Sequence, residues 1–243
     1  MSNTPAYRFP IKFDDVHYIA SLYTANKNKV NELLIGTGLK AGLHFFGQPL
    51  VALGLIQYKT SDLGAYNEII LAIPVIQSHE KNGWRNWLDL YAGHEKRKGG
   101  QFIIHIPVTT QQSVDAGRLL WGYPKIVLPI DHQFKQTNVS VKLLDENHQP
   151  LIQVNGGLGI GIPIPSMQLM TYSFLDNRLL KTKVDVLSGM KWKIGAQLKI
   201  KIDNQNHPIG KDIKALGIEN KNPLLTLESK RFKARFNEGQ QIS

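Results

Sequence analysis

The chemistry in this sequence centres on one lysine that stands among apolar residues. Residues 117–125 read GRLLWGYPK, and Lys125 runs directly into Ile126, Val127 and Leu128. The chain has 29 lysines and arginines, and such a side chain is usually a solvated surface charge. A buried amine loses much of its preference for the charged form and can attack a carbonyl carbon at neutral pH. Lys125 is therefore our candidate nucleophile.

A carboxylate also stands at the start of an otherwise apolar segment. Glu68 lies within LGAYNEIILAIPV, whose composition is typical of a β-strand. A carboxylate in such a place can transfer a proton or orient an amine. Taken alone, the segment fits a solvated glutamate at a strand end equally well.

Other motifs give weaker signals. The stretch GGLGIGIPIP (156–165) matches no phosphate-binding pattern, and its prolines stand where a dinucleotide site needs a helix, so we expect a turn or loop there. The eight histidines show no metal-binding spacing, and no serine lies in a GxSxG motif. We predict no metal site and no hydrolase triad.

Composition narrows the class of protein. Hydrophobic residues make up 42% and charged residues 20% of the 243 residues, which suits a globular fold. Absence of cysteine excludes disulfides and fits a reducing compartment. No leader-like or membrane-spanning apolar run is visible, so we expect a cytoplasmic protein with no membrane partner. The net charge of +10 comes largely from lysines that alternate along strands, which argues against a nucleic-acid partner.

The elements that must position Lys125 and Glu68 are mostly strands. An aromatic stripe at helical spacing, Trp84, Trp87, Leu88 and Tyr91, predicts a one-sided helix that packs against the fold or a neighbouring subunit. Further helices are predicted at 27–35 and 109–121. Strands are predicted at 17–24, 44–58, 66–76, 101–108, 125–134, 138–145, 150–156, 167–175, 178–187, 192–202 and 223–236.

This order predicts a mainly β (α+β) fold. Many strands without regular βαβ alternation favour an antiparallel barrel or sandwich with a few short helices. No repeat or linker marks a boundary, so we expect a single domain over residues 1–243 with an inserted helical segment near 79–100. Lys125 falls at a junction between a helix and a strand.

Two of these segments together resemble the acetoacetate decarboxylase family. The family has a Gly-x-Tyr-x-Glu strand, here Gly64 to Glu68, before a Gly-Arg-x-x-x-x-(Tyr/Phe)-Pro-Lys segment, here Gly117 to Lys125. The similarity extends from about Phe13 to Leu144. It implies an acetoacetate decarboxylase-like barrel or cone-like sheet and a homo-oligomer, with the aromatic segment as a candidate subunit contact.

The resemblance also implies roles for individual residues. Lys125 corresponds to the lysine that forms a Schiff base with the substrate ketone, and Glu68 to an active-site glutamate. Arg118 and Tyr123 correspond to an arginine beside the lysine-bearing helix and a pocket aromatic. With Tyr66 and Trp121 of the same two segments, they form the predicted substrate-binding set.

Three departures from the family pattern bear on mechanism. A second lysine follows the nucleophile in the decarboxylase, where this chain has Ile126. An arginine and a second glutamate of the family align with Val16 and Gly54. Desolvation alone can activate a lysine, so the loss of the second lysine does not exclude a Schiff base. Without the arginine, however, the carboxylate of a keto acid needs a different positive partner. The three departures therefore leave the predicted reaction class in place but make the identity of the substrate less certain to follow from the family.

The sequence thus predicts a cofactor-independent lyase that decarboxylates a small β-keto acid through a Schiff base on Lys125. The same iminium could serve an aldolase or a dehydratase acting on another keto acid. The alternative from a different class is a non-catalytic relative that binds a small carbonyl compound. The natural substrate and the number of subunits stay open.

Overall fold

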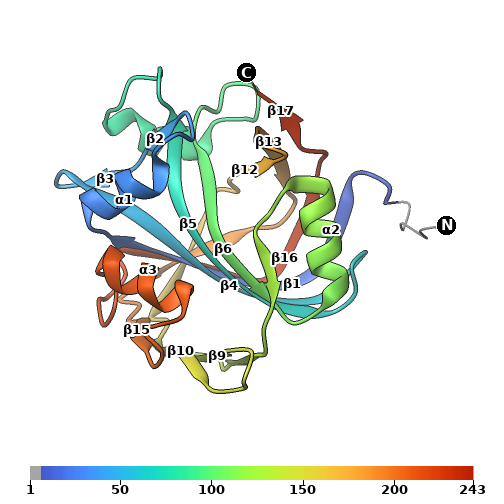
Figure 1. Cartoon of the computed structure of the whole chain (residues 1–243), viewed down its shortest axis with the longest axis vertical. Helices are drawn as coiled ribbons and strands as arrows, with labels where there is room; N and C mark the ends of the chain where they lie inside the picture. Colours follow the sequence, from blue (N-terminus) through green and yellow to red (C-terminus); the bar gives the residue numbers. More distant parts are fainter. Residues whose placement is uncertain (1–6, 243) are drawn as a thin grey trace.

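The computed structural model describes residues 7–242, and within them seven strands close into a barrel (Figure 1). Contacts between β13 and β16, such as Val184 with Phe236, complete the ring. Neighbouring strands are antiparallel except β6 and β12, which pair in parallel. In order around the ring, the strands are β16 (Leu225–Phe236), β1 (Ile11–Thr24), β4 (Gln48–Ser61), β5 (Tyr66–Gln77), β6 (Gly100–Val108), β12 (Leu169–Leu175) and β13 (Arg178–Val186).

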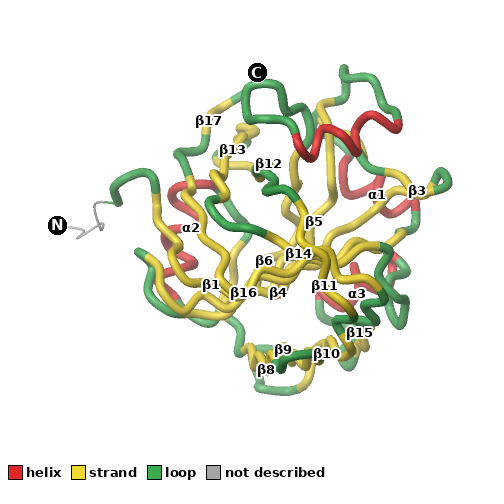
Figure 2. The backbone as a smooth tube through the Cα atoms, turned by 180° about the vertical axis from the view of Figure 1, so that it is seen from behind, coloured by secondary structure: helices red, strands yellow, loops and turns green. Residues whose placement is uncertain are grey.

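A smaller sheet and two helices cover one outer face of the barrel (Figure 2). The sheet contains β15 (Lys199–Ile202), β10 (Pro150–Gly157), β9 (Asn138–Leu144) and β8 (Ile130–Phe134). The helices α1 (Lys27–Leu34) and α3 (Pro208–Leu216) bury Val30 and Ile213 in the same core. The mainly β fold predicted from the sequence is confirmed.

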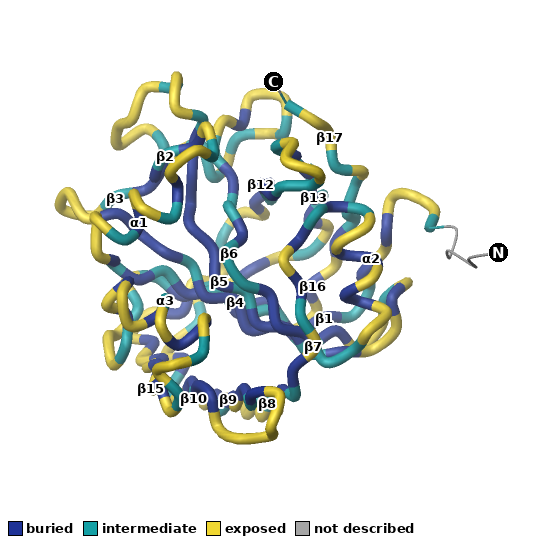
Figure 3. The backbone as a smooth tube through the Cα atoms, viewed as in Figure 1, coloured by how far each residue is buried: buried dark blue, intermediate teal, exposed yellow. Residues whose placement is uncertain are grey.

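Strands β4 and β5 are buried on both faces, which explains their almost continuous apolar sequences (Figure 3). Leu53 and Leu55 of β4 belong to the core between the barrel and the smaller sheet. Their neighbours Gly54 and Ile56 face the barrel interior, because successive side chains of a strand point to opposite faces.

The remaining elements extend the barrel or close its ends. The antiparallel pair β11 (Ile160–Ile164) and β14 (Met190–Ile194) continues the sheet beyond β16. Helix α2 (Gln111–Trp121) leads into β7 (Lys125–Val127), which pairs with β6. The segment between β5 and β6 holds the 3₁₀ helix η1 (Trp84–Tyr91). Short strands β2 (Leu39–Ala41), β3 (His44–Phe45) and β17 (Gln240–Gln241) pair at the edges.

Several predicted boundaries were wrong, each for a local reason. Residues 125–134 form two strands in different sheets, since Pro129 cannot donate a ladder hydrogen bond. The predicted strand 192–202 also divides, at Gly195 with φ +74°, into β14 and β15. The glycine-rich 156–165 segment turns at Gly159, as expected, but then forms β11 because β14 offers it a partner.

Two helices differ from the prediction. The aromatic segment 84–91 is a 3₁₀ helix without a side-chain cap, and it buries no residue fully. Helix α3 was missed, although Pro208 at its start and Gly217 at its end are typical helix boundaries. No helix within residues 7–242 has the length and apolar character needed to span a bilayer.

A half-buried histidine in β8, whose two ring nitrogens are buried, predicts acid sensitivity of the fold. Burial lowers the pKa of His132 to about 3, and the neighbouring His17 acts in the same direction. Neither ring nitrogen of His132 has a hydrogen-bond partner among residues 7–242. Between about pH 6.5 and about pH 3, His132 is protonated in the unfolded chain but stays neutral in the folded chain. The free energy of unfolding should therefore fall by up to about 1.4 kcal/mol for each unit by which the pH is lowered.

The substitution His132→Phe should remove this part of the acid sensitivity. We expect urea unfolding curves of the variant between pH 7 and pH 4 to lose less stability than those of the wild type. His79→Gln, which changes an exposed histidine, is the matched control. An identical pH dependence in His132→Phe and the wild type would contradict the prediction.

Candidate active site

Lys125 is held at the junction between α2 and β7, and only 3% of its surface is exposed. The turn depends on Gly122, the residue that ends α2 with φ +63°. A side chain there would also collide with the carbonyl group of Phe174. The glycine before Tyr123 therefore allows the chain to leave the helix and direct Lys125 inward.

Gly117 makes room for the stem of the same lysine. A Cβ atom at position 117 would lie 2.5 Å from Cδ and 2.8 Å from Cε of Lys125. The lysine stem thus lies against the bare backbone of α2, and this explains the glycine in the Gly-Arg to Pro-Lys segment. Ser113, one helical turn earlier, lies on the same side of α2.

Substitution Gly117→Ala should displace the Lys125 side chain. We expect kcat to fall by about tenfold or more because the amine leaves its hydrogen-bonded position. The matched control is Leu119→Ala, which introduces the same residue on the exposed face of α2. Steady-state rates and thermal melts of both variants test the prediction; an unchanged rate in Gly117→Ala would contradict it.

The lysine amine meets two oxygen atoms. Lys125 Nζ donates to Oε2 of Glu68 at 2.7 Å and to Oγ of Ser113 at 2.8 Å. Glu68 is 2% exposed, and its other oxygen accepts from the Tyr58 hydroxyl at 2.9 Å. The structure therefore forms a buried chain of contacts from Ser113 through Lys125 and Glu68 to Tyr58.

Aromatic rings surround this chain. Lys125 Nζ lies 5.3 Å from the centre of the Tyr66 ring, and that ring stacks on Tyr58 at 4.2 Å. Burial, with the negative charge of Glu68 adding to it, raises the pKa of both Tyr58 and Tyr66 well above the ordinary value. Both hydroxyls consequently keep their protons near neutral pH, and Tyr58 remains a donor to Glu68.

Two more predicted residues form an adjacent wall. Trp121 is 1% exposed, stacks on Tyr123, and donates from Nε1 to the carbonyl of Asn237 at 2.8 Å. Burial also raises the pKa of Tyr123, whose hydroxyl lies 2.6 Å from Oγ1 of Thr171. These contacts fix both rings in one orientation.

Arg118 lies on α2, outside the cavity that the other predicted residues line. Its side chain is exposed, does not line the cavity next to Lys125, and donates from Nε to the Lys125 carbonyl at 2.9 Å. Arg118 thus contacts the backbone of the Lys125 segment, and its contact with substrate stays a prediction.

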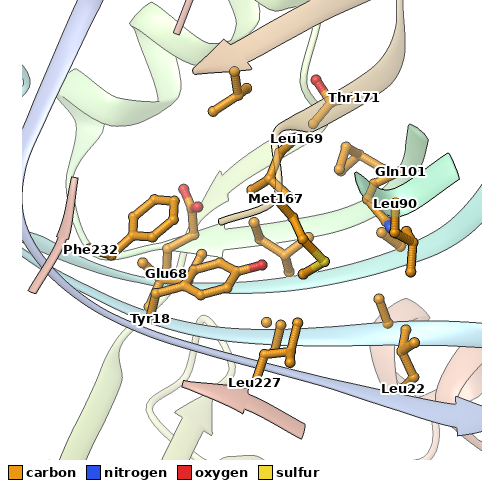
Figure 4. Close-up of a pocket in the computed structure, with 18 of the residues that line it drawn as sticks. Tyr18, Leu22, Glu68, Leu90, Gln101, Met167, Leu169, Thr171, Leu227 and Phe232 are labelled. Atoms are coloured by element: carbon orange, nitrogen blue, oxygen red, sulfur yellow. The ribbon is translucent and has the colours of Figure 1, made fainter. Parts of the chain in front are cut away.

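A cavity of about 450 Å³ inside the barrel opens onto Lys125 and Glu68 (Figure 4). Its walls are mainly aliphatic and aromatic, and its polar groups are few. An apolar cavity with a few convergent polar groups is the usual form of a small-molecule site. The predicted residues that line it are Tyr66, Glu68, Trp121, Tyr123 and Lys125.

The three departures from the family pattern occupy distinct places. Ile126 packs against the core outside the barrel, away from Lys125. Val16 is fully buried in the barrel interior, and Gly54 faces the cavity. An apolar residue and a bare backbone thus stand where charged side chains align.

Sequence reasoning missed three residues of the site. Ser113 could have been found from its i, i+4 relation to Gly117 on the predicted helix. Tyr58 is the cross-strand partner of Tyr66, a pairing that depends on the register of β4 and β5. Arg97, in the basic stretch after η1, lines the cavity and is 4% exposed. Nothing in the local sequence indicated that Arg97 turns inward.

Comparisons with known proteins agree with the geometry. A family model described as acetoacetate decarboxylase (ADC) matches residues 1–184. A search of curated proteins found no match. One solved structure from structural studies of acetoacetate decarboxylase is 14% identical with a TM-score of 0.70, and covers 97% of this chain and 90% of that chain.

Two further solved structures share the fold. Acetoacetate decarboxylase from Legionella pneumophila has a TM-score of 0.69 at 15% identity, over 99% of this chain and 93% of that chain. The enduracididine biosynthesis enzyme MppR, complexed with the condensation product of pyruvate and imidazole 4-carboxaldehyde, has a TM-score of 0.67 at 12% identity, over 99% and 92%. At such identities the structures show a common fold, whereas the family model matches well over half of the sequence. The chain belongs to the acetoacetate decarboxylase family.

Proposed function

We propose that the protein is a cofactor-independent lyase that decarboxylates a β-keto acid through a Schiff base on Lys125. The observation that supports it most is the buried Lys125 amine, 2.7 Å from Glu68 and at the wall of an apolar cavity. Family membership supports an enzyme of this general type.

Glu68 offers a way to generate the neutral amine. Transfer of one proton along the 2.7 Å contact turns a buried ammonium and carboxylate into a neutral amine and a neutral acid. The transfer removes two charges from an apolar region, where separated charges are costly. Ser113 and Tyr58 stay bonded to the two partners and hold them in place.

The neutral amine attacks the substrate ketone and gives a carbinolamine, which loses water to form an iminium. When the bond to the carboxylate carbon breaks, carbon dioxide leaves and its electron pair moves into the iminium to give an enamine. Loss of water from the carbinolamine uses the proton that Glu68 took from Lys125, so Glu68 takes one further proton from the solvent and donates it to the enamine carbon, which restores the iminium. Water then hydrolyses it, releases the ketone and frees Lys125.

A second reaction class uses the same iminium. A retro-aldol or dehydration step needs the same electron sink and differs in which bond lies aligned with it. The MppR structure, of the same fold, holds a condensation product of pyruvate and an aldehyde, which keeps this candidate in view. A relative that only binds carbonyl compounds is the third candidate.

One panel of keto acids separates these possibilities. We expect the protein to release carbon dioxide from at least one β-keto acid and from none of the matching α-keto acids. Consumption of a keto acid without carbon dioxide would favour aldol or dehydration chemistry and overturn the decarboxylase assignment. Binding without any turnover would favour the non-catalytic relative.

A further inference from the structure

The cavity extends well beyond the polar groups around Lys125. Its volume of about 450 Å³ falls within the roughly 300–1,000 Å³ of sites that enclose drug-sized molecules. A four-carbon keto acid would leave most of that volume empty. Figure 4 shows Glu68 on one side of the cavity and Leu22, Leu90 and Gln101 on the other. The space has a polar end at Lys125 and Glu68 and a long, mainly apolar remainder, which Gln101 and Arg97 also line.

Small residues that face one another on neighbouring strands form one wall of this mainly apolar part of the cavity, which we call the floor. Ala20 of β1 pairs with Gly54 of β4, and Ala52 of β4 pairs with Ala72 of β5. All four residues line the cavity. Larger side chains at these positions would fill the barrel interior, so the cavity exists because the strands carry small residues there.

This floor leads away from the lysine along the strands. On β5, the cavity-facing positions after Glu68 are Ile70 and Ala72, because alternate side chains share a face. Four residues at roughly 3.3 Å each place Ala72 about 13 Å from Glu68. The floor is therefore long enough for an extended chain of several carbon atoms.

The segment between β5 and β6 forms the roof of the far end. Trp87, Leu88 and Leu90 from η1 line the cavity. Arg97 fastens this segment, since it donates to the carbonyls of Leu90, Gly99 and Gln168. These bonds occupy Nε and Nη1 of Arg97 with backbone groups.

We infer that the substrate is a β-keto acid with an unbranched apolar chain of several carbons beyond the ketone. The inference rests on the proposed function, with the ketone at Lys125, and places the chain between the small-residue floor and η1. Burial of a methylene contributes a roughly constant increment of binding free energy. The value of kcat/KM should therefore rise by about fourfold for each added methylene until the cavity is full.

A series of 3-oxo acids from about four to twelve carbons tests this expectation. We expect kcat/KM to rise with chain length and then reach a plateau or fall. A maximum at four carbons would overturn the inference. Preference for acids with a second carboxylate at the chain end would also overturn it, and would give Arg97 a charge-binding role.

Substitutions in the floor should shorten the accepted chain in a set order. Gly54→Leu is sterically reasonable, because a Cβ there would meet Ile70 at 3.4 Å, an ordinary contact. Position 54 lies closer along the strands to Glu68 than position 72 does. Gly54→Leu should therefore lower the optimum chain length more than Ala72→Leu. The control Leu119→Phe adds volume on an exposed face of α2 and should leave the optimum unchanged.

A binding measurement separates failure of the inference from failure of the proposed function. Titration calorimetry of alkan-2-ones with Lys125→Met measures chain binding without a Schiff base. The chain site is supported, even if no acid is turned over, when two results are found. The affinity of Lys125→Met for alkan-2-ones should rise with chain length, and Ala72→Leu should lower the affinity for the longer ketones. Turnover of acetoacetate together with affinity independent of length would overturn the chain site alone.

Discussion

Lys125→Arg is expected to abolish turnover of every keto acid that the protein accepts. Arginine stays protonated in proteins and cannot form an imine, so the reaction would lose its electron sink. Steady-state release of carbon dioxide should fall below detection. Arginine is also longer than lysine, and the space beside Gly117 is tight, so the result needs a second variant.

Lys125→Met supplies that variant because it keeps an unbranched side chain and removes only the amine. Its loss of activity should equal that of Lys125→Arg. Removal of one partner from a buried ion pair lowers stability, so we expect a lower melting temperature than that of the wild type, with the circular dichroism spectrum of the folded protein retained. Measurable turnover in both variants would remove Lys125 from the mechanism.

Glu68→Gln is expected to lower kcat by about 10²–10⁴-fold, because glutamine keeps the size of the side chain but cannot exchange a proton with Lys125. The pH profile of kcat/KM should change as well, since an ionisable group of the free enzyme has been removed. An unchanged rate with altered thermal stability would indicate that Glu68 supports folding only.

Tyr58→Phe is a graded comparison for Glu68→Gln. The Tyr58 hydroxyl donates to Oε1 of Glu68 at 2.9 Å, whereas Lys125 contacts the other oxygen, Oε2. Its removal should cost about ten- to a hundredfold in kcat, since a hydrogen bond to a charged group contributes about 1.5–3 kcal/mol. A loss larger than that of Glu68→Gln would make Tyr58, and not Glu68, the group that exchanges protons.

Local sequence was sufficient to single out the two residues that meet at the centre of this site. Lys125 stands out because apolar residues flank it, and Glu68 because it begins an apolar strand. The 2.7 Å contact between them crosses from β7 to β5, although 57 residues separate them in the chain. The resemblance to a known family suggested that pairing, whereas hydrophobic periodicity alone could not.

The cavity itself could not be predicted from the sequence. It depends on the registers that set Ala20 against Gly54 and Ala52 against Ala72, and a shift by one residue would turn these positions outward. Arg97 illustrates the same limit. A basic stretch is usually solvated, and only the path of the chain after η1 places this arginine inside.

Two boundary errors have a simpler origin. Pro129 and Gly195 each interrupt a segment whose sequence is typical of one continuous strand. On either side of both residues the chain enters different sheets, because neither continues a ladder well. These breaks were visible in the sequence, but their consequence depended on the partner strands.

Reductive trapping shows directly whether Lys125 forms a Schiff base with a keto acid. The wild-type protein would be incubated with a keto acid that it decarboxylates, reduced with borohydride, digested, and analysed by mass spectrometry. We expect one added mass, that of the reduced adduct, on the peptide that contains Lys125. Continued turnover with no adduct, or an adduct on a different lysine, would show that Lys125 does not form the Schiff base.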